Sequence, residues 1–209
     1  MTGFSRLSLE EFLSALASEA PTPGGGTAAA VAGAMGASLA EMVAALTLSK
    51  EKYAASHAAV RPVAAAAAEA REEFLDLARE DSDAYDRVLA ARRLSKETEE
   101  QKAERARQLA AANRRAAEIP MRTARVAARL LSALPELAQS GNPNAVSDVG
   151  TAALLLEAAI EGALLNVSIN LPGSGDPAFV AEMQRETVGL QEEAQRLRAQ
   201  VLAAARKRL

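Results

Sequence analysis

Apolar residues recur three or four positions apart along most of the chain, and no segment alternates apolar and polar residues like a half-buried strand. The first such stretch places Leu9, Phe12, Leu13 and Leu16 on one side, and Ser8 with Glu11 ahead of it forms the pattern of a capping box. We therefore expect an all-α fold, a bundle of long, closely packed helices.

A central helix built from small residues is predicted after the turn at 21–27, which is rich in proline and glycine. It should run from about Gly25 to the mid-fifties. Glu41 is the one charged residue between Gly26 and Lys50. A neighbouring backbone can approach this helix closely, because small residues recur on one side of it at positions 26, 29, 33, 36, 40 and 44.

The other helices follow from apolar spacing and breaker residues. Pro62 is expected to begin the third helix, which should reach the low nineties, and the acidic segment 95–100 should begin the fourth. The fourth helix should continue, straight or kinked, through Pro120 to Leu134, with a short helical turn from Pro135. Loops are expected at 141–144 and 171–177, and further helices at about 149–169 and 178–206.

Composition limits the class of protein. The 209 residues are 49% hydrophobic and 3% aromatic, so alanine and leucine must fill the core of one domain, residues 1–209. The net charge of −3 gives no reason to expect a nucleic acid partner. With no cysteine and a single histidine, His57, a thiolate or multi-histidine metal site cannot be built within one chain.

Residues 27–48 are long enough to span a membrane, but Glu41 interrupts them and small residues dominate them. The first residues also lack the basic and apolar blocks of a signal peptide. We therefore expect a soluble, cytoplasmic protein with no membrane partner.

Asp81 interrupts an otherwise apolar stripe of the third helix that includes Phe74, Ala78, Tyr85 and Val88. A carboxylate there must be paired or hydrogen-bonded, or its pKa must be raised. Such groups gather at functional sites, although structural ion pairs have the same signature. The pattern leaves both interpretations open.

The helix near 149–165 is apolar nearly all round and should be central. Asp148 and Asn166 fall on one of its faces with Asn170 close by, opposite Glu157 and Glu161. Asp148 is either a helix cap or a functional acid. The two asparagines either fix a packing register or bind a ligand, and the two glutamates are expected on a solvated edge.

Two further features allow a structural or a functional interpretation. Continuing the second helix would place Lys50, Tyr53 and His57 on one side, where Lys50 either complements the helix dipole or meets an anion. The first amides of the helix after Gly24 have no internal partner and can bind lone pairs or anions, unless the turn is only a breaker before a packed helix.

In their order along the chain, these segments resemble formiminotetrahydrofolate cyclodeaminase, the C-terminal domain of the bifunctional formiminotransferase-cyclodeaminase. A related methenyltetrahydrofolate cyclohydrolase branch shares the pattern. Tyr85 stands where the family usually has phenylalanine. The matching segments are 23–29, 46–50, Asp81 with 84–85, 141–142, 147–148, 162–163 and 166–171.

The resemblance implies an enzyme acting on a reduced folate, with Asp81 and Asp148 converging beside the glycine turn to divide the roles of general acid and base. Lys50 would hold a folate carboxylate or tune a neighbouring aspartate. The substrate-binding set implied by the resemblance is Gly24, Gly25, Gly26, Thr27, Tyr85, Asn142, Asn166 and Asn170.

Three functions are compatible with this set. The first is cyclisation of 5-formiminotetrahydrofolate with loss of ammonia, the second is methenyltetrahydrofolate cyclohydrolase, and the third is a non-catalytic helical folate-binding or scaffold protein. No metal or cofactor beyond the folate is expected. A homodimer is expected, with the formiminotransferase step on another chain, and a preference for polyglutamylated folate is left open.

Overall fold

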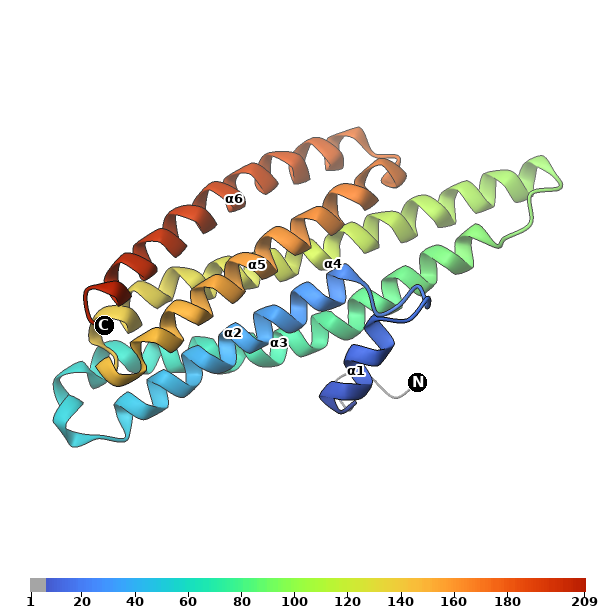
Figure 1. The fold of residues 1–209 in the computed structure, drawn as a ribbon. Helices are drawn as coiled ribbons and strands as arrows, with labels where there is room; N and C mark the ends of the chain where they lie inside the picture. Colours follow the sequence, from blue (N-terminus) through green and yellow to red (C-terminus); the bar gives the residue numbers. More distant parts are fainter. Residues whose placement is uncertain (1–6) are drawn as a thin grey trace.

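The computed structural model describes residues 7–209, and all regular structure in this part of the chain is helical, which confirms the all-α class (Figure 1). The expectation about a signal peptide concerns in part the first six residues, which lie outside the described residues. The long elements are α1 (Leu9–Leu16), α2 (Gly25–Leu48), α3 (Ala54–Arg92), α4 (Glu99–Ser140), α5 (Val146–Asn170) and α6 (Pro177–Arg206). Short 3-10 helices connect them, namely η2 (Glu51–Tyr53), η3 (Pro143–Ala145) and η4 (Leu171–Ser174).

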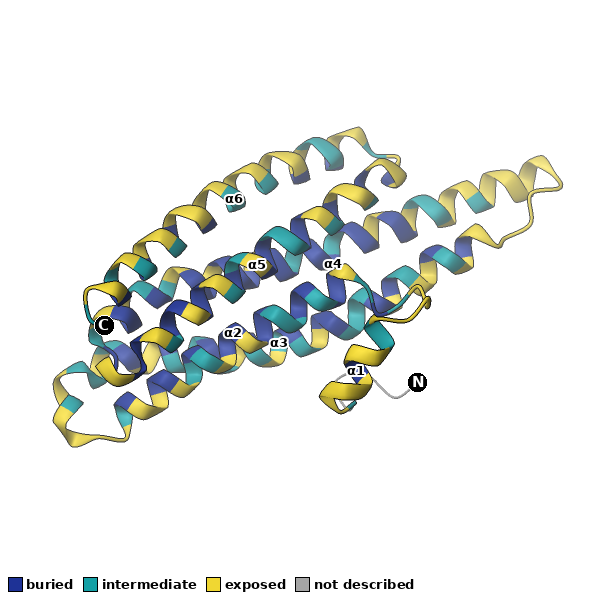
Figure 2. Ribbon diagram, in the orientation of Figure 1, coloured by how far each residue is buried: buried dark blue, intermediate teal, exposed yellow. Residues whose placement is uncertain are grey.

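Helices α2, α3, α4 and α5 form the centre of the molecule, and each packs along two or more of the others. In Figure 1, α2 and α5 lie in front of α3 and α4, α6 runs alongside α5, and α1 stands off the bundle near the start of α2. Helices α3 and α4 extend beyond the rest as a hairpin. Figure 2 shows the buried positions concentrated where the four central helices face one another.

The small residues of α2 allow the close packing that the sequence predicts, and all six of the predicted positions are buried. A Cβ atom at Gly33 would lie 2.5 Å from the Phe74 ring, so that ring occupies the space that any other residue would need. Gly36 likewise lies against Leu156 of α5. Helix α2 therefore packs closely on both α3 and α5.

The capping box predicted at Ser8 is confirmed, and the fourth helix begins within the predicted acidic segment. Ser8 Oγ accepts from the Glu11 amide at 3.2 Å, while the Glu11 carboxylate accepts from the Ser8 amide at 2.7 Å. Thr98 and Gln101 form the same reciprocal arrangement at the start of α4. Each pair satisfies amides that a helix N-terminus cannot satisfy internally.

The boundary between the second and third helices was predicted wrongly. Helix α2 ends at Leu48 rather than in the mid-fifties, because Lys50 takes an extended conformation and a 3-10 turn follows. Helix α3 already begins at Ala54, with Pro62 in its interior. The buried side chains of Val60 and Val63 on either side of the proline compensate for the lost backbone hydrogen bond.

Helix α4 also continues through its prolines. The helix runs without interruption through Pro120 and Pro135 to Ser140. Ile119 and Met121 are completely buried beside the first of these prolines, so tertiary packing outweighs the local preference to stop.

By length and hydropathy alone, the segments Gly25–Leu48 and Pro143–Ser174 could cross a membrane. In the fold they are central helices of the bundle, and 50% and 44% of the respective windows are buried within it.

Candidate active site

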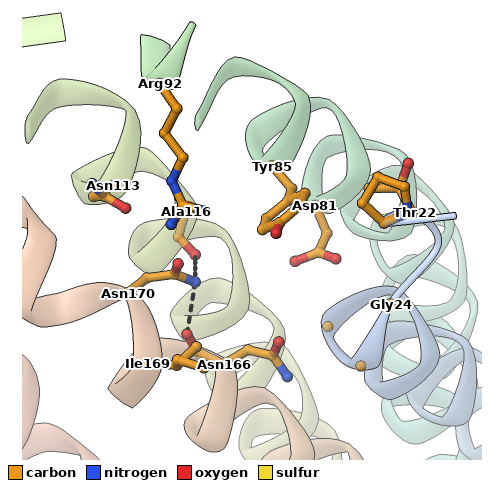
Figure 3. A pocket seen from close by; sticks show the side chains of 13 residues that line it. Thr22, Gly24, Asp81, Tyr85, Arg92, Asn113, Ala116, Asn166, Ile169 and Asn170 are labelled. Atoms are coloured by element: carbon orange, nitrogen blue, oxygen red, sulfur yellow. Dashed lines mark hydrogen bonds between the residues drawn. The ribbon is translucent and has the colours of Figure 1, made fainter. Parts of the chain in front are cut away.

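A cavity of about 310 Å³ opens where α2 begins and α5 ends, against the middle of α3 and α4. Figure 3 shows polar side chains from α3, α4 and α5 around this space, opposite the turn that precedes α2. Its volume lies at the low end of the range for small-molecule sites. The lining residues are Pro21, Thr22, Gly24, Gly25, Gly26, Asp81, Tyr85, Arg92, Asn113, Ala116, Asn166, Ile169 and Asn170.

The glycine turn forms one wall of the cavity. Gly24 is the N-cap of α2 and provides no side-chain cap, so the first amides of the helix have no capping side chain of their own. A Cβ atom on Gly26 would lie 2.3 Å from Asp81 Oδ1. Only glycine at this position lets the carboxyl group of α3 approach the N-terminus of α2 so closely.

Asp81 is the acidic group of the cavity. Its Oδ2 accepts a hydrogen bond from Thr27 Oγ1 at 2.9 Å, and Thr27 Oγ1 also lies 3.1 Å from Ser82 Oγ. Burial raises the pKa of Asp81 above its ordinary value, while hydrogen bonds from the hydroxyl and the amide of Thr27 oppose the shift. The group is thus a carboxyl that holds its proton to higher pH than an exposed aspartate does.

Two asparagines at the end of α5 face the carboxyl group across the cavity (Figure 3). Asn166 Nδ2 donates to the Gly162 carbonyl at 2.8 Å, and Asn170 Nδ2 donates to the carbonyls of Ala116 and Asn166 at 3.1 and 2.9 Å. Asn170 uses both of its N–H groups in this way, so its oxygen is the group that it can offer to a ligand, whereas Asn166 keeps one N–H as well as its oxygen. The bond from Asn170 to the Ala116 carbonyl also fixes α5 to α4.

Most of the predicted binding residues are brought together here. The Thr27 hydroxyl donates a hydrogen bond to Asp81. The cavity is lined by Asp81 together with six of the predicted binding residues, namely Gly24, Gly25, Gly26, Tyr85, Asn166 and Asn170. Sequence reasoning did not single out Arg92 and Asn113. Arg92 continues the Asp81 stripe of α3 at helical spacing, so extending that stripe by one more turn would have found it.

Three predicted residues lie at the other end of the bundle. Lys50 follows α2, Asn142 precedes η3, and Asp148 is in the first turn of α5. Because a helix rises about 1.5 Å per residue, Asp148 lies about 27 Å along α5 from Asn166. Asp81 lies in the cavity at the Asn166 end of α5, and Asp148 lies at the other end of that helix. The expectation that Asp81 and Asp148 converge is therefore wrong within one chain.

Asn142 fixes the turn at that end. Its Oδ1 accepts from Tyr53 Oη at 3.0 Å and from the Asn144 amide at 3.1 Å, and its own amide donates to Thr47 Oγ1 at 2.8 Å. The residue is only 3% exposed. Its side-chain oxygen is thus already engaged, and this geometry gives it a role in holding α2, η2 and η3 together.

Asp148 is not the cap of α5. The helix begins at Val146 directly after η3, with Ala145 as an N-cap that has no side-chain bond. Within residues 7–209, the structure shows no ion pair or hydrogen bond for the side chain of Asp148 or of Lys50. Glu157 and Glu161 were expected on a solvated edge but bond to Arg198 and Gln191 of α6 at 3.0 and 2.8 Å.

Among residues 7–209 the structure shows no cluster of three or more histidine or carboxylate ligands. An all-α bundle with a small polar cavity, an uncapped helix N-terminus and one partly buried carboxyl group defines a protein that can bind a small polar molecule and exchange a proton with it.

Residues 8–188 match the family model of formiminotransferase-cyclodeaminase. The chain therefore belongs to the formiminotransferase-cyclodeaminase family. It is 40% identical to a methenyltetrahydrofolate cyclohydrolase of Methylorubrum extorquens over 89% of both chains. It is 36% identical to the formimidoyltransferase-cyclodeaminase of Sus scrofa, covering 93% of this chain and 36% of that protein.

The fold agrees with that of a solved relative. The structure of a formiminotetrahydrofolate cyclodeaminase from Thermotoga maritima superposes with a TM-score of 0.86, covering 97% of this chain and 98% of the other at 34% identity. The family resemblance stated from the sequence is thus confirmed.

Proposed function

We propose that this protein is a formimidoyltetrahydrofolate cyclodeaminase, which closes 5-formiminotetrahydrofolate to 5,10-methenyltetrahydrofolate and releases ammonia. The observation that carries the proposal is the Asp81 carboxyl, partly buried at the N-terminus of α2 in the cavity of a chain that belongs to this family. Some relatives are named for the cyclodeaminase activity and one for the cyclohydrolase activity, and both names support a folate as the substrate.

The reaction needs proton transfer more than it needs strong activation. N10 attacks the formimino carbon on N5, and N10 loses its proton as the new C–N bond forms. The exocyclic nitrogen then gains a proton, its bond to the carbon breaks and ammonia leaves. The attack is intramolecular, so the substrate supplies most of the proximity itself. A base for N10 and an acid for the departing nitrogen remain for the protein to supply.

Asp81 is suited to the acid role, because its raised pKa keeps the proton available at higher pH than for an exposed aspartate. The unpaired amides of α2 and the oxygens of Asn166 and Asn170 would bind the polar edge of the pterin. Arg92 contributes the positive charge that the glutamate tail of a folate requires.

Methenyltetrahydrofolate cyclohydrolase is the second candidate, favoured by the 40% identity to the Methylorubrum extorquens enzyme over 89% of both chains. In that reaction water adds to the methenyl carbon and gives up one proton. N5 then takes a proton as its bond to that carbon breaks, and the added hydroxyl loses its remaining proton to leave the 10-formyl compound. The same acid and base serve both reactions.

The proposal includes four further properties. The protein is a cytoplasmic homodimer, it uses no metal or cofactor beyond the folate, and it follows a formiminotransferase that supplies its substrate. The amidinium carbon is electrophilic without a Lewis acid, so we expect activity to survive prolonged dialysis against a chelator. Polyglutamylated folates should bind more tightly than the monoglutamate, because each added carboxylate can meet the basic side chains at the end of α3.

The test offers purified protein the two folates separately. Ammonia release from 5-formiminotetrahydrofolate supports the cyclodeaminase, and loss of methenyl absorbance supports the cyclohydrolase. Asp81→Asn should lower kcat by about 100-fold or more for whichever reaction occurs, the usual scale for a general acid or base. If neither folate is converted by the wild-type protein, the chain is a binding or scaffold protein.

A further inference from the structure

Two buried hydroxyl groups lie next to the Asp81 carboxyl but outside the cavity. Thr27 of α2 is completely buried, and Ser82 of α3 is 4% exposed. Thr27 Oγ1 lies 2.9 Å from Asp81 Oδ2 and 3.1 Å from Ser82 Oγ, so the three groups form a chain that joins the start of α2 to the middle of α3. Neither hydroxyl residue lines the cavity, so any effect on a bound molecule must pass through Asp81.

The direction of these hydrogen bonds follows from the protons available. Each hydroxyl group has one proton, and an ionised carboxyl group can only accept. Thr27 therefore donates its proton to Asp81 and accepts the proton of Ser82. The chain of hydroxyl groups thus points toward the carboxyl.

The position of Thr27 in its helix leaves its hydroxyl available for this purpose. A threonine inside a helix commonly donates to the carbonyl four residues earlier, as Thr47 of the same helix does to Val43 at 2.8 Å. Helix α2 begins at Gly25, so the residue four positions before Thr27 lies outside the helix. The Thr27 hydroxyl bonds to α3 instead.

The hydrogen bond distinguishes the two oxygens of the carboxyl group. Because Asp81 Oδ2 accepts the Thr27 hydroxyl, the acidic proton is favoured on Oδ1. Oδ1 lies 2.3 Å from the place that a Cβ atom of Gly26 would occupy, and Gly26 lines the cavity. The proton is therefore held beside the first turn of α2, the side from which Asp81 faces the cavity in Figure 3.

Charged groups around Asp81 are few. Among the described residues that line the cavity, the other titratable groups are Tyr85 and Arg92, both on α3 itself, while α2, α4 and α5 contribute glycines, asparagines, an alanine and an isoleucine. Glu80, the neighbour of Asp81 in the sequence, is paired with two arginines of α4 at 2.6 and 3.0 Å. Burial raises the pKa of Asp81, and the hydrogen bonds from Thr27 oppose that shift. Thr27 is thus the residue best placed to adjust the acidity of the group.

We propose that Thr27, oriented by Ser82, is a positioning residue that binds Oδ2 of Asp81 and so presents the acidic proton on Oδ1 to the substrate. The inference rests on the proposed function, in which Asp81 is the acid. The proton passes from Oδ1 to the exocyclic nitrogen while the bond from that nitrogen to the carbon breaks. The electron pair of this bond stays on the nitrogen, ammonia leaves, and the methenyl cation and the Asp81 carboxylate remain.

The hydroxyl assists this step because it binds the carboxylate more strongly than the acid. A hydrogen bond to an ionised acceptor is roughly twice as strong as one between neutral groups. The bond from Thr27 to Asp81 therefore strengthens as the proton departs. An interaction that is stronger in the transition state than in the ground state raises kcat.

The first experiment compares Thr27→Val with Thr27→Ser on the folate that the wild type converts. Valine keeps the volume of threonine without its hydroxyl, and serine keeps the hydroxyl. Thr27→Val should lower kcat at the optimum pH by about 10- to 100-fold, the scale of a hydrogen bond to a charged group, with KM nearly unchanged. Thr27→Ser should restore kcat to near the wild-type value.

The pH profile gives a readout that loss of stability alone would not move. Activity should fall at high pH as Asp81 loses its proton. In Thr27→Val this limb should move up by about one pH unit, because the bond that favours the carboxylate is gone. A Thr27→Val enzyme with the kcat and the pH profile of the wild type would overturn the inference.

Ser82→Ala tests the chain itself. The substitution removes the donor to Thr27, so kcat should fall by about 3- to 10-fold, the scale of a neutral hydrogen bond, and the limb should move in the same direction. Thr27→Val/Ser82→Ala should be no worse than Thr27→Val, because Ser82 acts through Thr27. Additive losses would contradict the chain.

Thr47→Val is the matched control, the same substitution at another completely buried threonine of α2. It removes the bonds to the Val43 carbonyl and from the Asn142 amide at the other end of the helix, so Tm should fall at least as much as in Thr27→Val. Its pH profile should match that of the wild type. An equal movement of the limb would mean that Thr27 acts only through stability.

A titration that does not need turnover separates this inference from the proposed function. The carboxyl carbon of Asp81, identified by its absence from the NMR spectrum of Asp81→Asn, should titrate at higher pH in Thr27→Val than in the wild type. Wild-type protein that converts neither folate would refute the proposed function, while the titration would still report on Thr27. An unmoved titration would refute the positioning role alone. If Thr27→Val does not fold, Ser82→Ala must show the same direction of change.

Discussion

The two ends of the central bundle are made from the same four helices but use their polar groups differently. At the cavity end, helix amides, asparagine oxygens and Arg92 surround open space. At the other end, Thr47, Tyr53, Asn142 and Asn144 bond to one another and close the turn.

Charged side chains are distributed in the opposite way, because the acidic one at the open end is bonded and those at the closed end are not. Asp81 at the open end is partly buried and bonded to Thr27, while the side chains of Lys50 and Asp148 at the closed end have no bonding partner within residues 7–209. The comparison teaches that one end is organised to receive a molecule and the other to present charges outward.

Gly26→Ala should have the largest effect and should damage the open end alone. The new Cβ atom would lie 2.3 Å from Asp81 Oδ1, so the carboxyl must leave its position against Thr27. We expect activity to fall by about 100-fold, as for loss of an acid, and the free energy of unfolding to fall by roughly 1–3 kcal/mol, as for overpacking. Initial rates and urea unfolding measure the two effects.

Gly24→Ala is the matched control, because a Cβ atom there meets only the Pro21 carbonyl at 3.8 Å. It should leave stability and kcat close to those of the wild type. Equal losses in the two variants would show that the whole turn, rather than its contact with Asp81, is what the site requires.

Asn142→Ala should damage the closed end through stability. The substitution leaves the Tyr53 hydroxyl and the Asn144 amide without their acceptor, and each of these partly buried hydrogen bonds contributes roughly 0.5–1.5 kcal/mol. Asn166→Ala at the open end should instead raise KM with a smaller loss of stability. Thermal unfolding and steady-state kinetics on both variants distinguish the roles, and the reverse pattern would place the binding site at the closed end.

Sequence patterns predicted which residues line the cavity better than they predicted which residues lie far from it. Asp81 stood out because it interrupts an apolar stripe, and Asn166 and Asn170 because amides interrupt an apolar helix, while Tyr85 entered through the family resemblance. Helical spacing is local information, so it identifies which residues share a face and how far apart they lie on one helix. It cannot show that Asp81 of another helix lies at the Asn166 end of that face, about 27 Å along α5 from Asp148.

Helix boundaries failed where packing overrides local preference. The sequence predicts that Pro62 begins a helix and that Pro135 begins a separate helical turn, yet α3 and α4 continue through these prolines. The predicted continuation through Pro120 is confirmed. The break after Leu48 has no proline or glycine to announce it. These outcomes depend on contacts between helices that one sequence does not display.

Arg92→Ala should have a moderate effect confined to substrate binding. Arg92 lines the cavity and contributes a charge but lies apart from Asp81 in Figure 3. We expect KM for the folate to rise about 10-fold, equivalent to about 1.4 kcal/mol, with kcat nearly unchanged. Arg93→Ala is the control, because the neighbouring arginine is exposed and does not line the cavity. A fall in kcat alone would place Arg92 in the chemistry instead.

The smallest effect should be a pH dependence of stability that has opposite signs for Asp81 and Asp176. Burial raises the pKa of Asp81, so above the ordinary aspartate value of about 3.9 the folded state holds more protons than the unfolded state. Stability therefore falls as pH rises through the raised pKa. Asp81→Asn removes this loss, so its stability relative to the wild type should improve from pH 4 to pH 8.

Asp176, the N-cap of α6, supplies the opposite case. The Phe179 amide lowers the pKa of its carboxyl, with smaller contributions from the Ala178 amide and Arg114. Its stabilising effect is present above the ordinary aspartate value and is lost as pH falls through the lowered pKa. Asp176→Asn should thus compare worst with the wild type at pH 8 and best in acid. Urea unfolding of both variants at pH 4, 6 and 8 measures the two slopes. Slopes of equal sign would mean that Asp81 is stabilised as a carboxylate by Thr27, which would remove the argument for its acid role.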